Sequence, residues 1–413
     1  MFDLDKWQEI LMTMRRNKLR TFLTAFGVFW GIFMLVLLLG AGNGMQNGVL
    51  NEFGGGAVNS LFVSGGKTSL PWHGLKPGRE IKLTNADMEA VRQQVAGIEL
   101  LAPRNRLSGE YTIMRGAKNG SYQVFGANGE FFQLNGEKLT AGRFLSPLDL
   151  AERRKVMVMG EKVRKVLFGD DDALGQYVQV KGVFFKVVGI FTSTGNQGRN
   201  EERAYVPFNT FQTTFNQYNQ VQLLGLTTRG GLPVKELETQ VRLLMARRHQ
   251  FDPADKQALD LNNNEEEMER FNGLFNGIKV FVSIIGVLTL VAGVVGVSNI
   301  MIIIVQERTR EIGVRKALGA TPWSIVSMIV QESVVITAVS GYLGLLAGVG
   351  LLAGLSYGIE QSGAKLPYFD RPGVDATVAV SAILLLVVAG ALAGLVPAIK
   401  AANVKPIEAL RAD

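Results

Sequence analysis

The amino-acid sequence predicts a membrane α-helical protein with four transmembrane helices and an α+β extracytoplasmic domain inserted between the first and second spans. Three observations support this prediction. Four uncharged stretches are each long enough to cross a bilayer, which takes about 20 residues. Basic residues cluster beside these stretches, and the long segment between the first two carries the patterns of strands and helices.

The uncharged stretches explain an apolar content of 47% in a chain with 43 basic and 36 acidic residues. They run Thr21–Asn51, Val280–Gln306, Ser333–Ile359 and Ala376–Ile399. The first is longer than the apolar region of a signal peptide, roughly 7–15 residues, so we expect an uncleaved anchor.

Basic residues lie before the first span, between the second and third spans, and after the fourth. They are Lys6, Arg15, Arg16, Lys18, Arg20, Arg308, Arg310, Arg315, Lys316, Lys400, Lys405 and Arg411. The connection between the third and fourth spans holds only Lys365 and Arg371. The positive-inside rule therefore predicts that both termini and the middle loop are cytoplasmic. The net charge of +7 is then explained by basic residues that orient the chain in the membrane, and we expect no nucleic-acid partner.

These patterns divide the chain into nine segments. They are a cytoplasmic amphipathic helix (1–20), a first span (21–43), the extracytoplasmic domain with a stalk (44–275), a second span (276–306), a cytoplasmic loop (307–322), a third span (323–359), a short extracytoplasmic loop (360–375), a fourth span (376–399) and a cytoplasmic tail (400–413).

The extracytoplasmic segment mixes both kinds of secondary structure. Strand patterns occur at Ser60–Ser64, Tyr111–Arg115, Val156–Met159, Tyr177–Lys181, Phe184–Phe191 and Gln222–Thr228. Helical patterns occur at Asn85–Val95, after the N-cap candidate Thr84, and at Val234–Arg248.

Two membrane helices are expected to be long. An apolar stripe that begins at Met268 runs into the second span without a breaker, which predicts one helix from Glu265 to Val305, roughly 60 Å long. Its first part would form a stalk outside the membrane. The stretch Trp323–Ile359 is expected to be a single helix, with Thr321 as N-cap and Pro322 at the first position.

Glycines recur at four-residue spacing in the last two spans, where helix backbones can approach closely. They are Gly344, Gly348, Gly350, Gly354, Gly358, Gly390 and Gly394. Two interpretations stay open. The glycines could pack the four helices of one chain together, or they could form the dimer seam between two copies.

The sequence offers little for catalysis or ligand binding. There is no cysteine, and the two histidines, His73 and His249, are far apart, so we expect no metal and no catalytic centre. The segment Ser64–Thr68 resembles the end of a phosphate-binding loop, but Leu61 stands where that motif needs glycine, so we expect a turn. Glu332 is the one charge within the spans, and paired broken helices are missing, which argues against a substrate site in the bilayer.

The middle loop places a few apolar residues among charges of both signs, as a small docking helix requires. The candidate docking residues are Glu307, Arg308, Thr309, Arg310, Glu311, Ile312, Gly313, Arg315, Lys316, Leu318, Gly319 and Ala320, with Val314 as a further apolar residue. Gly319 can cap the helix. From these residues alone, a solvated loop carrying orientation charge is an equal alternative.

The run Glu307–Ala320 closely resembles the signature loop of MacB/FtsX-type ABC transporter permeases. The tail, with Pro397–Ala402 and Pro406–Arg411, is similar to the C-terminal end of that family. In the inserted domain, weaker matches occur in the order of a MacB-like periplasmic core domain. They are Gly142–Phe144, Val156–Gly160, Leu167–Gly169, Leu174–Gln176 and Phe185–Ile190.

This resemblance implies a non-catalytic permease of the bacterial inner membrane that pairs with a second copy or a related permease. An ABC ATPase, which would bind ATP and Mg, docks on the middle loop and moves the outer domains through the stalks. MacB itself carries its ATPase on the same chain, so here we expect a separate polypeptide. A periplasmic adaptor and an outer-membrane channel would complete an efflux assembly. The family also includes lipoprotein-releasing permeases and FtsX-type regulators of cell-wall hydrolases, which remain alternatives.

Overall fold

The computed structural model of the 413-residue chain describes residues 18–52, 55–109, 112–193, 195–362, 366, 369–370, 372–374 and 376–405. The predicted N-terminal amphipathic helix lies almost entirely outside these residues, as does the tail segment Pro406–Arg411. The chain divides into two compact units. The helical unit holds the residues up to Gly48 and from Leu274 onward, and the inserted unit is Val49–Gly273.

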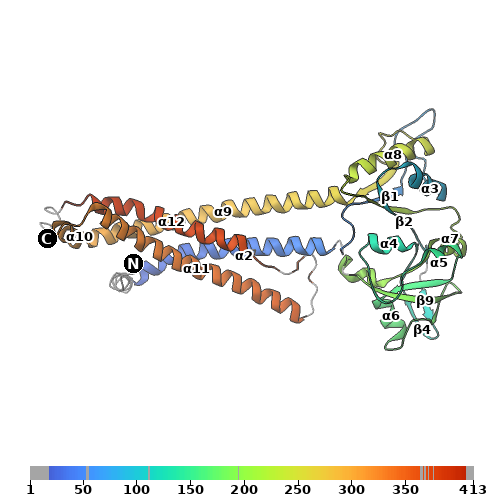
Figure 1. Ribbon diagram of the computed structural model, residues 1–413, viewed down its shortest axis with the longest axis horizontal. Coiled ribbons are helices and arrows are strands. Elements are labelled where there is room, and N and C mark those ends of the chain that lie inside the picture. Colours follow the sequence, from blue (N-terminus) through green and yellow to red (C-terminus); the bar gives the residue numbers. More distant parts are fainter. Residues whose placement is uncertain are drawn as a thin grey trace. The chain divides into compact units, whose positions relative to one another are not determined.

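Within its described residues, the helical unit contains four helices long and apolar enough to cross a membrane, as the sequence predicts (Figure 1). These and one short helix are α2 (Lys18–Glu52), α9 (Asn264–Glu307), α10 (Thr309–Ala317), α11 (Pro322–Ser362) and α12 (Ala376–Ala402). Two of these helices extend beyond the expected spans. Helix α2 continues to Glu52 and α11 to Ser362.

Both predictions of long helices are confirmed. The 44 residues of α9 form one helix without a break, and at 1.5 Å per residue it is about 66 Å long. The projection of its first part beyond the membrane stays a prediction. Helix α11 is also continuous, and the Thr321 hydroxyl accepts a hydrogen bond from the Ser324 backbone N–H at 3.3 Å, as an N-cap does.

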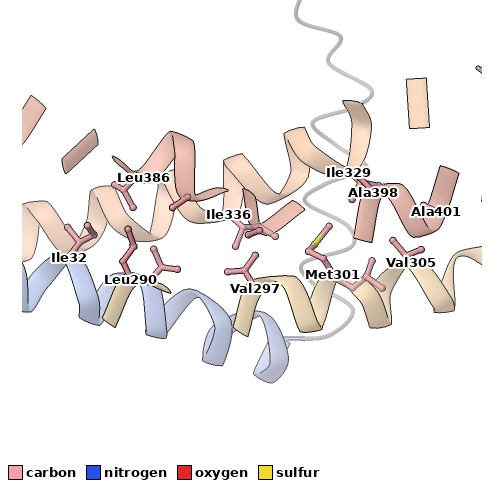
Figure 2. Packing of buried hydrophobic residues seen from close by; sticks show 14 of the residues in the cluster. Ile32, Leu290, Val297, Met301, Val305, Ile329, Ile336, Leu386, Ala398 and Ala401 are labelled. Carbon is pink, nitrogen blue, oxygen red and sulfur yellow. The ribbon is translucent and has the colours of Figure 1, made fainter. Parts of the chain in front are cut away.

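The core of the helical unit is a row of apolar side chains from the five helices described above, and Figure 2 shows part of it. Ile32 of α2, Leu290 and Val297 of α9, Ile336 of α11 and Leu386 of α12 are each at most 6% exposed. Much of the remaining apolar surface is uncovered within one chain. In the most apolar stretch of α9, for example, only 22% is buried. A bilayer can cover such a surface, so the exposure agrees with a membrane setting.

The inserted unit is built on a twelve-stranded mixed sheet with short helices on its faces. Its strands are β1 (Ser60–Gly65), β2 (Ile98–Arg106), β3 (Thr112–Arg115), β4 (Lys118–Ser121), β5 (Gln123–Ala127), β6 (Lys138–Gly142), β7 (Val156–Gly160), β8 (Tyr177–Val180), β9 (Val183–Thr192), β10 (Arg203–Pro207), β11 (Leu223–Thr228) and β12 (Leu259–Asn263). Their order is β12-β1-β11-β2-β5-β10-β7-β9-β8-β3-β4, with β6 paired to β9.

Seven helices complete the described part of this unit. They are α3 (Asn85–Gln94), α4 (Gly129–Leu134), α5 (Pro147–Ala151), α6 (Glu161–Phe168), the 3-10 helix η1 (Asn196–Glu202), α7 (Phe208–Thr214) and α8 (Val234–His249). Helices α3 and α8 share a core with one face of β1, β11 and β2, whereas α4 packs with Ala102, Phe125 and Tyr205 in a second core.

The predicted strands and helices of the inserted unit are confirmed, although Tyr111 lies outside the described residues. Thr84 caps α3 through a capping box with Asp87, and this carboxylate also accepts hydrogen bonds from Arg248 and His249. His249 therefore belongs to a structural network. The turn predicted at Ser64–Thr68 is wrong, since Ser64 and Gly65 end β1. Lys67 pairs with Glu80 in an isolated bridge.

Candidate docking site

The loop between the second and third spans folds as α10, a nine-residue helix. Arg308 is its N-cap, and the Thr309 hydroxyl donates a hydrogen bond to the Val305 carbonyl at 3.1 Å. The helix ends because Gly319 adopts a φ of +101°, a conformation that suits glycine. Gly319 thus terminates the helix as the sequence predicts.

The inner face of α10 is packed against the helical unit. Ile312 and Gly313 are buried, and Ile312 is only 3% exposed. Ile312 belongs to the same core as Met301 and Val305 of α9 and Ala398 of α12. Figure 2 labels the last three of these residues. Ile312 therefore anchors α10 to two long helices, α9 and α12.

Three basic side chains of the loop reinforce this anchorage. Lys316 Nζ donates hydrogen bonds to the Ala402 and Val404 carbonyl oxygens, both at 2.7 Å, where a cation complements the end of α12. Arg315 donates to Glu311 at 2.8 Å and to the Met328 sulfur at 2.9 Å. The third cation, Arg308, faces α11.

Arg308 Nη1 lies 3.6 Å from Glu332 Oε2 of α11, and the Glu332 side chain is only 4% exposed. This acidic residue, which interrupts the apolar pattern of the third span, thus pairs with the residue that precedes α10. An ion pair with one buried member ties the position of α10 to that of α11, because separating it would leave a buried charge behind.

The outer face of α10 is formed by Arg310, Val314 and Leu318, which recur every four residues and so lie on one side. All three are exposed, and Leu318 reaches 84%. Glu307, Glu311 and Ala317 are exposed around them, while Thr309 and Ala320 are half-buried. The twelve predicted residues are therefore divided between an anchoring inner face and an accessible outer face.

The site includes residues that the sequence did not single out for docking. Trp323, in the first turn of α11, is 76% exposed. Its place directly after the proline that opens the helix was a usable signal, because a tryptophan at a helix entrance is amphipathic and suits an interface. Met328 and Val404 could not have been found, since only the packing brings them to α10.

The seven glycines of the candidate seam fall into two groups. A Cβ on Gly344 would lie 2.5 Å from the Phe29 carbonyl oxygen, and one on Gly348 would lie 2.8 Å from the Val36 side chain. Gly390 and Gly394 face α11 equally closely. These four serve packing within the chain. The other three, Gly350, Gly354 and Gly358, have no atom of the described chain within 4 Å of such a Cβ.

The described parts of the chain contain no group of three or more His, Cys, Asp or Glu side chains able to hold a metal ion. The arrangement of α10 instead suits protein–protein contact, with apolar residues surrounded by charges of both signs.

Comparisons with known proteins agree with this architecture. Residues 21–244 match the family model of the MacB-like periplasmic core domain, and residues 283–406 match that of the FtsX-like permease C-terminal region. The macrolide export ATP-binding/permease protein MacB of Bdellovibrio bacteriovorus is 28% identical over 97% of this chain and 60% of its own length. The pyoverdine export ATP-binding/permease protein PvdT of Pseudomonas putida is 28% identical over 99% of this chain and 60% of its own length.

The chain thus spans about 60% of the length of these relatives. Among solved structures, the periplasmic region of MacB from Actinobacillus actinomycetemcomitans matches with a TM-score of 0.43 and 19% identity, over 53% of this chain and 94% of the other. The family models together cover most of the sequence, in the order that the fold shows. The chain therefore belongs to the family of MacB-like ABC transporter permeases, which join a MacB-like periplasmic core domain to an FtsX-like permease region.

Proposed function

We propose that this chain is the permease subunit of an ABC-type export system in the bacterial inner membrane. In this proposal both termini and α10 face the cytoplasm, and an ABC ATPase docks on the outer face of α10. The ATPase binds ATP and Mg and performs the hydrolysis, so this chain itself carries no catalytic centre. The names of the two relatives, which concern export of macrolides and of pyoverdine, support export without defining a substrate here.

One observation carries the proposal, namely the division of α10 into an anchored and an accessible face. A partner that binds Arg310, Val314 and Leu318 would hold a helix that is itself fastened to α11 and α12. Pulling on such a helix moves the helices to which it is anchored. A solvated loop would need neither the buried Ile312 nor the Arg308–Glu332 pair.

Coupling to the inserted unit would follow α9. This helix runs without interruption from Asn264, in the inserted unit, to Glu307, directly before Arg308. Displacement of α10 during the ATPase cycle would pass along this backbone, because an unbroken helix has no hinge to absorb it. A second permease copy, a periplasmic adaptor and an outer-membrane channel would complete the assembly. Membrane lipid or the second copy would cover Gly350, Gly354 and Gly358.

The test compares partner capture by matched variants of the tagged full-length chain, purified gently from its native membrane. Reversing Arg310 and replacing Leu318 with aspartate changes two exposed residues of the outer face. Arg315 is a poorer target, since its loss would also break the contacts with Glu311 and Met328. Lys400→Glu, an exposed charge reversal near the end of α12, serves as the control.

Mass spectrometry of the bound proteins should identify a Walker-type ATPase with the wild type and with Lys400→Glu. The double variant Arg310→Glu/Leu318→Asp should reach the membrane in equal amount but lose at least nine-tenths of that ATPase. Full retention of the ATPase by this double variant would exclude the outer face of α10 as the docking site.

A further inference from the structure

Arg104, on β2 of the inserted unit, carries a positive charge that no ion pair with a described residue balances. Its guanidinium carbon lies 5.0 Å from the centroid of the Phe125 ring and 5.4 Å from that of Phe131. Among the described residues, no carboxylate forms an ion pair or hydrogen bond with its side chain. Desolvation by burial lowers the pKa of Arg104, yet a guanidinium keeps its charge. The aromatic rings therefore hold a cation that still has its hydrogen-bond donors available.

A second guanidinium adds to the excess of positive charge. Arg203 of β10 lies over the same Phe125 ring, 5.6 Å from its centroid, and its charge opposes that of Arg104. The nearby acid, Glu137, is only 6% exposed and accepts its hydrogen bonds from Tyr205 and Asn135 rather than from either arginine. Burial raises the pKa of Glu137 to about 7, so at neutral pH it supplies only part of a negative charge. An anion from outside would relieve this imbalance.

Arg104 lines a groove of about 240 Å³ on the face of the sheet that α3 and α8 leave uncovered. The groove crosses four neighbouring strands in the order β12-β1-β11-β2. Its other lining residues are Phe62 and Ser64 of β1, Leu223 of β11, and Asp260 and Asn262 of β12. Side chains alternate along a strand, so Leu61 and Val63 enter the core under the helices while Phe62 and Ser64 face the groove. The groove thus combines apolar side chains with a cationic end at Arg104 on β2, and its one acidic lining residue, Asp260, lies at the opposite edge on β12.

We propose that this groove, the Arg104 groove, binds a small organic carboxylate with an apolar body. The carboxylate would accept two hydrogen bonds from the guanidinium of Arg104, whose planar donors match its two oxygens. The apolar body would lie against Phe62 and Leu223, and Ser64 and Asn262 would offer hydrogen bonds at the rim. The positive charge of Arg104 favours an anion, and the apolar side chains of Phe62 and Leu223 favour an anion with apolar surface. This binding requires no ATPase, so its test does not depend on whether an ATPase docks on α10.

The test measures binding of 4-phenylbutyrate to the full-length chain in lipid nanodiscs by isothermal titration calorimetry. The neutral amide 4-phenylbutyramide and the small anion acetate are the ligand controls. We expect saturable binding of 4-phenylbutyrate, and binding at least about tenfold weaker for the amide and for acetate, since each lacks one of the two recognised features.

The variant Arg104→Gln should weaken 4-phenylbutyrate binding by about tenfold or more, because a charge-assisted pair is lost. The matched control Arg106→Gln changes an exposed arginine two residues along the same strand and should leave the affinity unchanged. Ser64→Trp, which fills the groove without altering charge, should abolish binding and tests the site if Arg104→Gln lowers the melting temperature. Absence of binding to the wild type, equal binding of the amide, or unchanged affinity in Arg104→Gln and Ser64→Trp would each overturn the proposal.

Discussion

Replacing Glu137 with glutamine should stabilise the inserted unit at alkaline pH. One carboxylate oxygen of Glu137 accepts hydrogen bonds from the Tyr205 hydroxyl at 2.8 Å and from the Asn135 amide at 3.2 Å. The other oxygen, Oε2, is buried without a hydrogen-bond partner. Desolvation therefore raises the pKa of Glu137 from 4.5 to about 7, and the Tyr205 hydrogen bond offsets only part of the increase.

The direction of the pH dependence follows from this raised pKa. Below about pH 4.5 the carboxyl is protonated in both folded and unfolded chains, and it costs the fold nothing. Between about 4.5 and 7 the folded chain retains a proton that the unfolded chain has lost, so the free energy of unfolding falls as pH rises. At about 1.4 kcal/mol per pKa unit, the total loss is on the order of 3 kcal/mol. Glutamine keeps an acceptor for Tyr205 but never ionises, so the variant should gain about 1–3 kcal/mol at pH 8 and almost nothing at pH 5.

Hydrogen–deuterium exchange of the β10 peptide, which contains Tyr205, measures this difference in the full-length chain. Rates at pH 5 and pH 8 are corrected for the intrinsic exchange of the amides and compared between wild type and Glu137→Gln. Glu99→Gln, which changes an exposed carboxylate on β2, is the control and should match the wild type at both pH values. Equal protection of wild type and Glu137→Gln at pH 8 would refute the assignment of a buried, ionising carboxyl.

Three further variants test the packing. Gly344→Ala should lower the melting temperature of the purified chain by several degrees, because the added Cβ would clash with α2. Gly354→Ala on the same helix is the control and should leave the melting temperature unchanged. Equal melting temperatures of the two variants would argue against the close approach of α11 and α2. Asp149→Asn should cost about 1–3 kcal/mol at pH 7, measured by exchange of α5, because the buried Asp149 carboxylate has two arginine partners. Burial alone would raise the pKa of Asp149, but the hydrogen bonds from Arg143 and Ser146 outweigh it and lower this pKa to about 2. This stabilisation therefore exists above about pH 4 and disappears toward pH 2, and a pH-independent difference would be inconsistent with it. Glu332→Gln should weaken the pair with Arg308 and speed exchange in residues 309–317, while unchanged exchange would show that the pair does not hold α10.

The membrane helices were predictable because their signals are local. An uncharged stretch, a proline such as Pro322 at a helix start, or the missing breaker before the second span each act through neighbouring residues.

Half of the strands were not predicted, for physical reasons. Strand β2 contains Pro103 and three charged residues, which contradict a strand pattern, and β4 is the polar segment Lys118–Ser121. Strand β2 is held in place by pairing with β11, which is distant in sequence, whereas β4 pairs with its neighbour β3 despite its polar residues.

The docking site was only partly predictable for the same reason. The sequence indicated the residues of α10 but not the side on which each would lie, because that depends on α11 and α12. Arg310 and Arg315 look alike as loop cations, yet one is exposed and the other contacts Met328. The groove at Arg104 left no pattern in the sequence, since its lining comes from four strands between residues 62 and 262.

The junction between β12 and α9 has a consequence for how the chain tolerates insertions. Strand β12 ends at Asn263 and α9 begins at Asn264, so no loop separates them. Each residue of an α-helix turns the chain by about 100° and advances it by about 1.5 Å. One residue inserted here would thus shift the following residues of α9 by one helical position, about 100° of rotation, relative to the strand that precedes them. Because the junction contains no loop residue, a change of length there falls directly on the register of β12 or of α9.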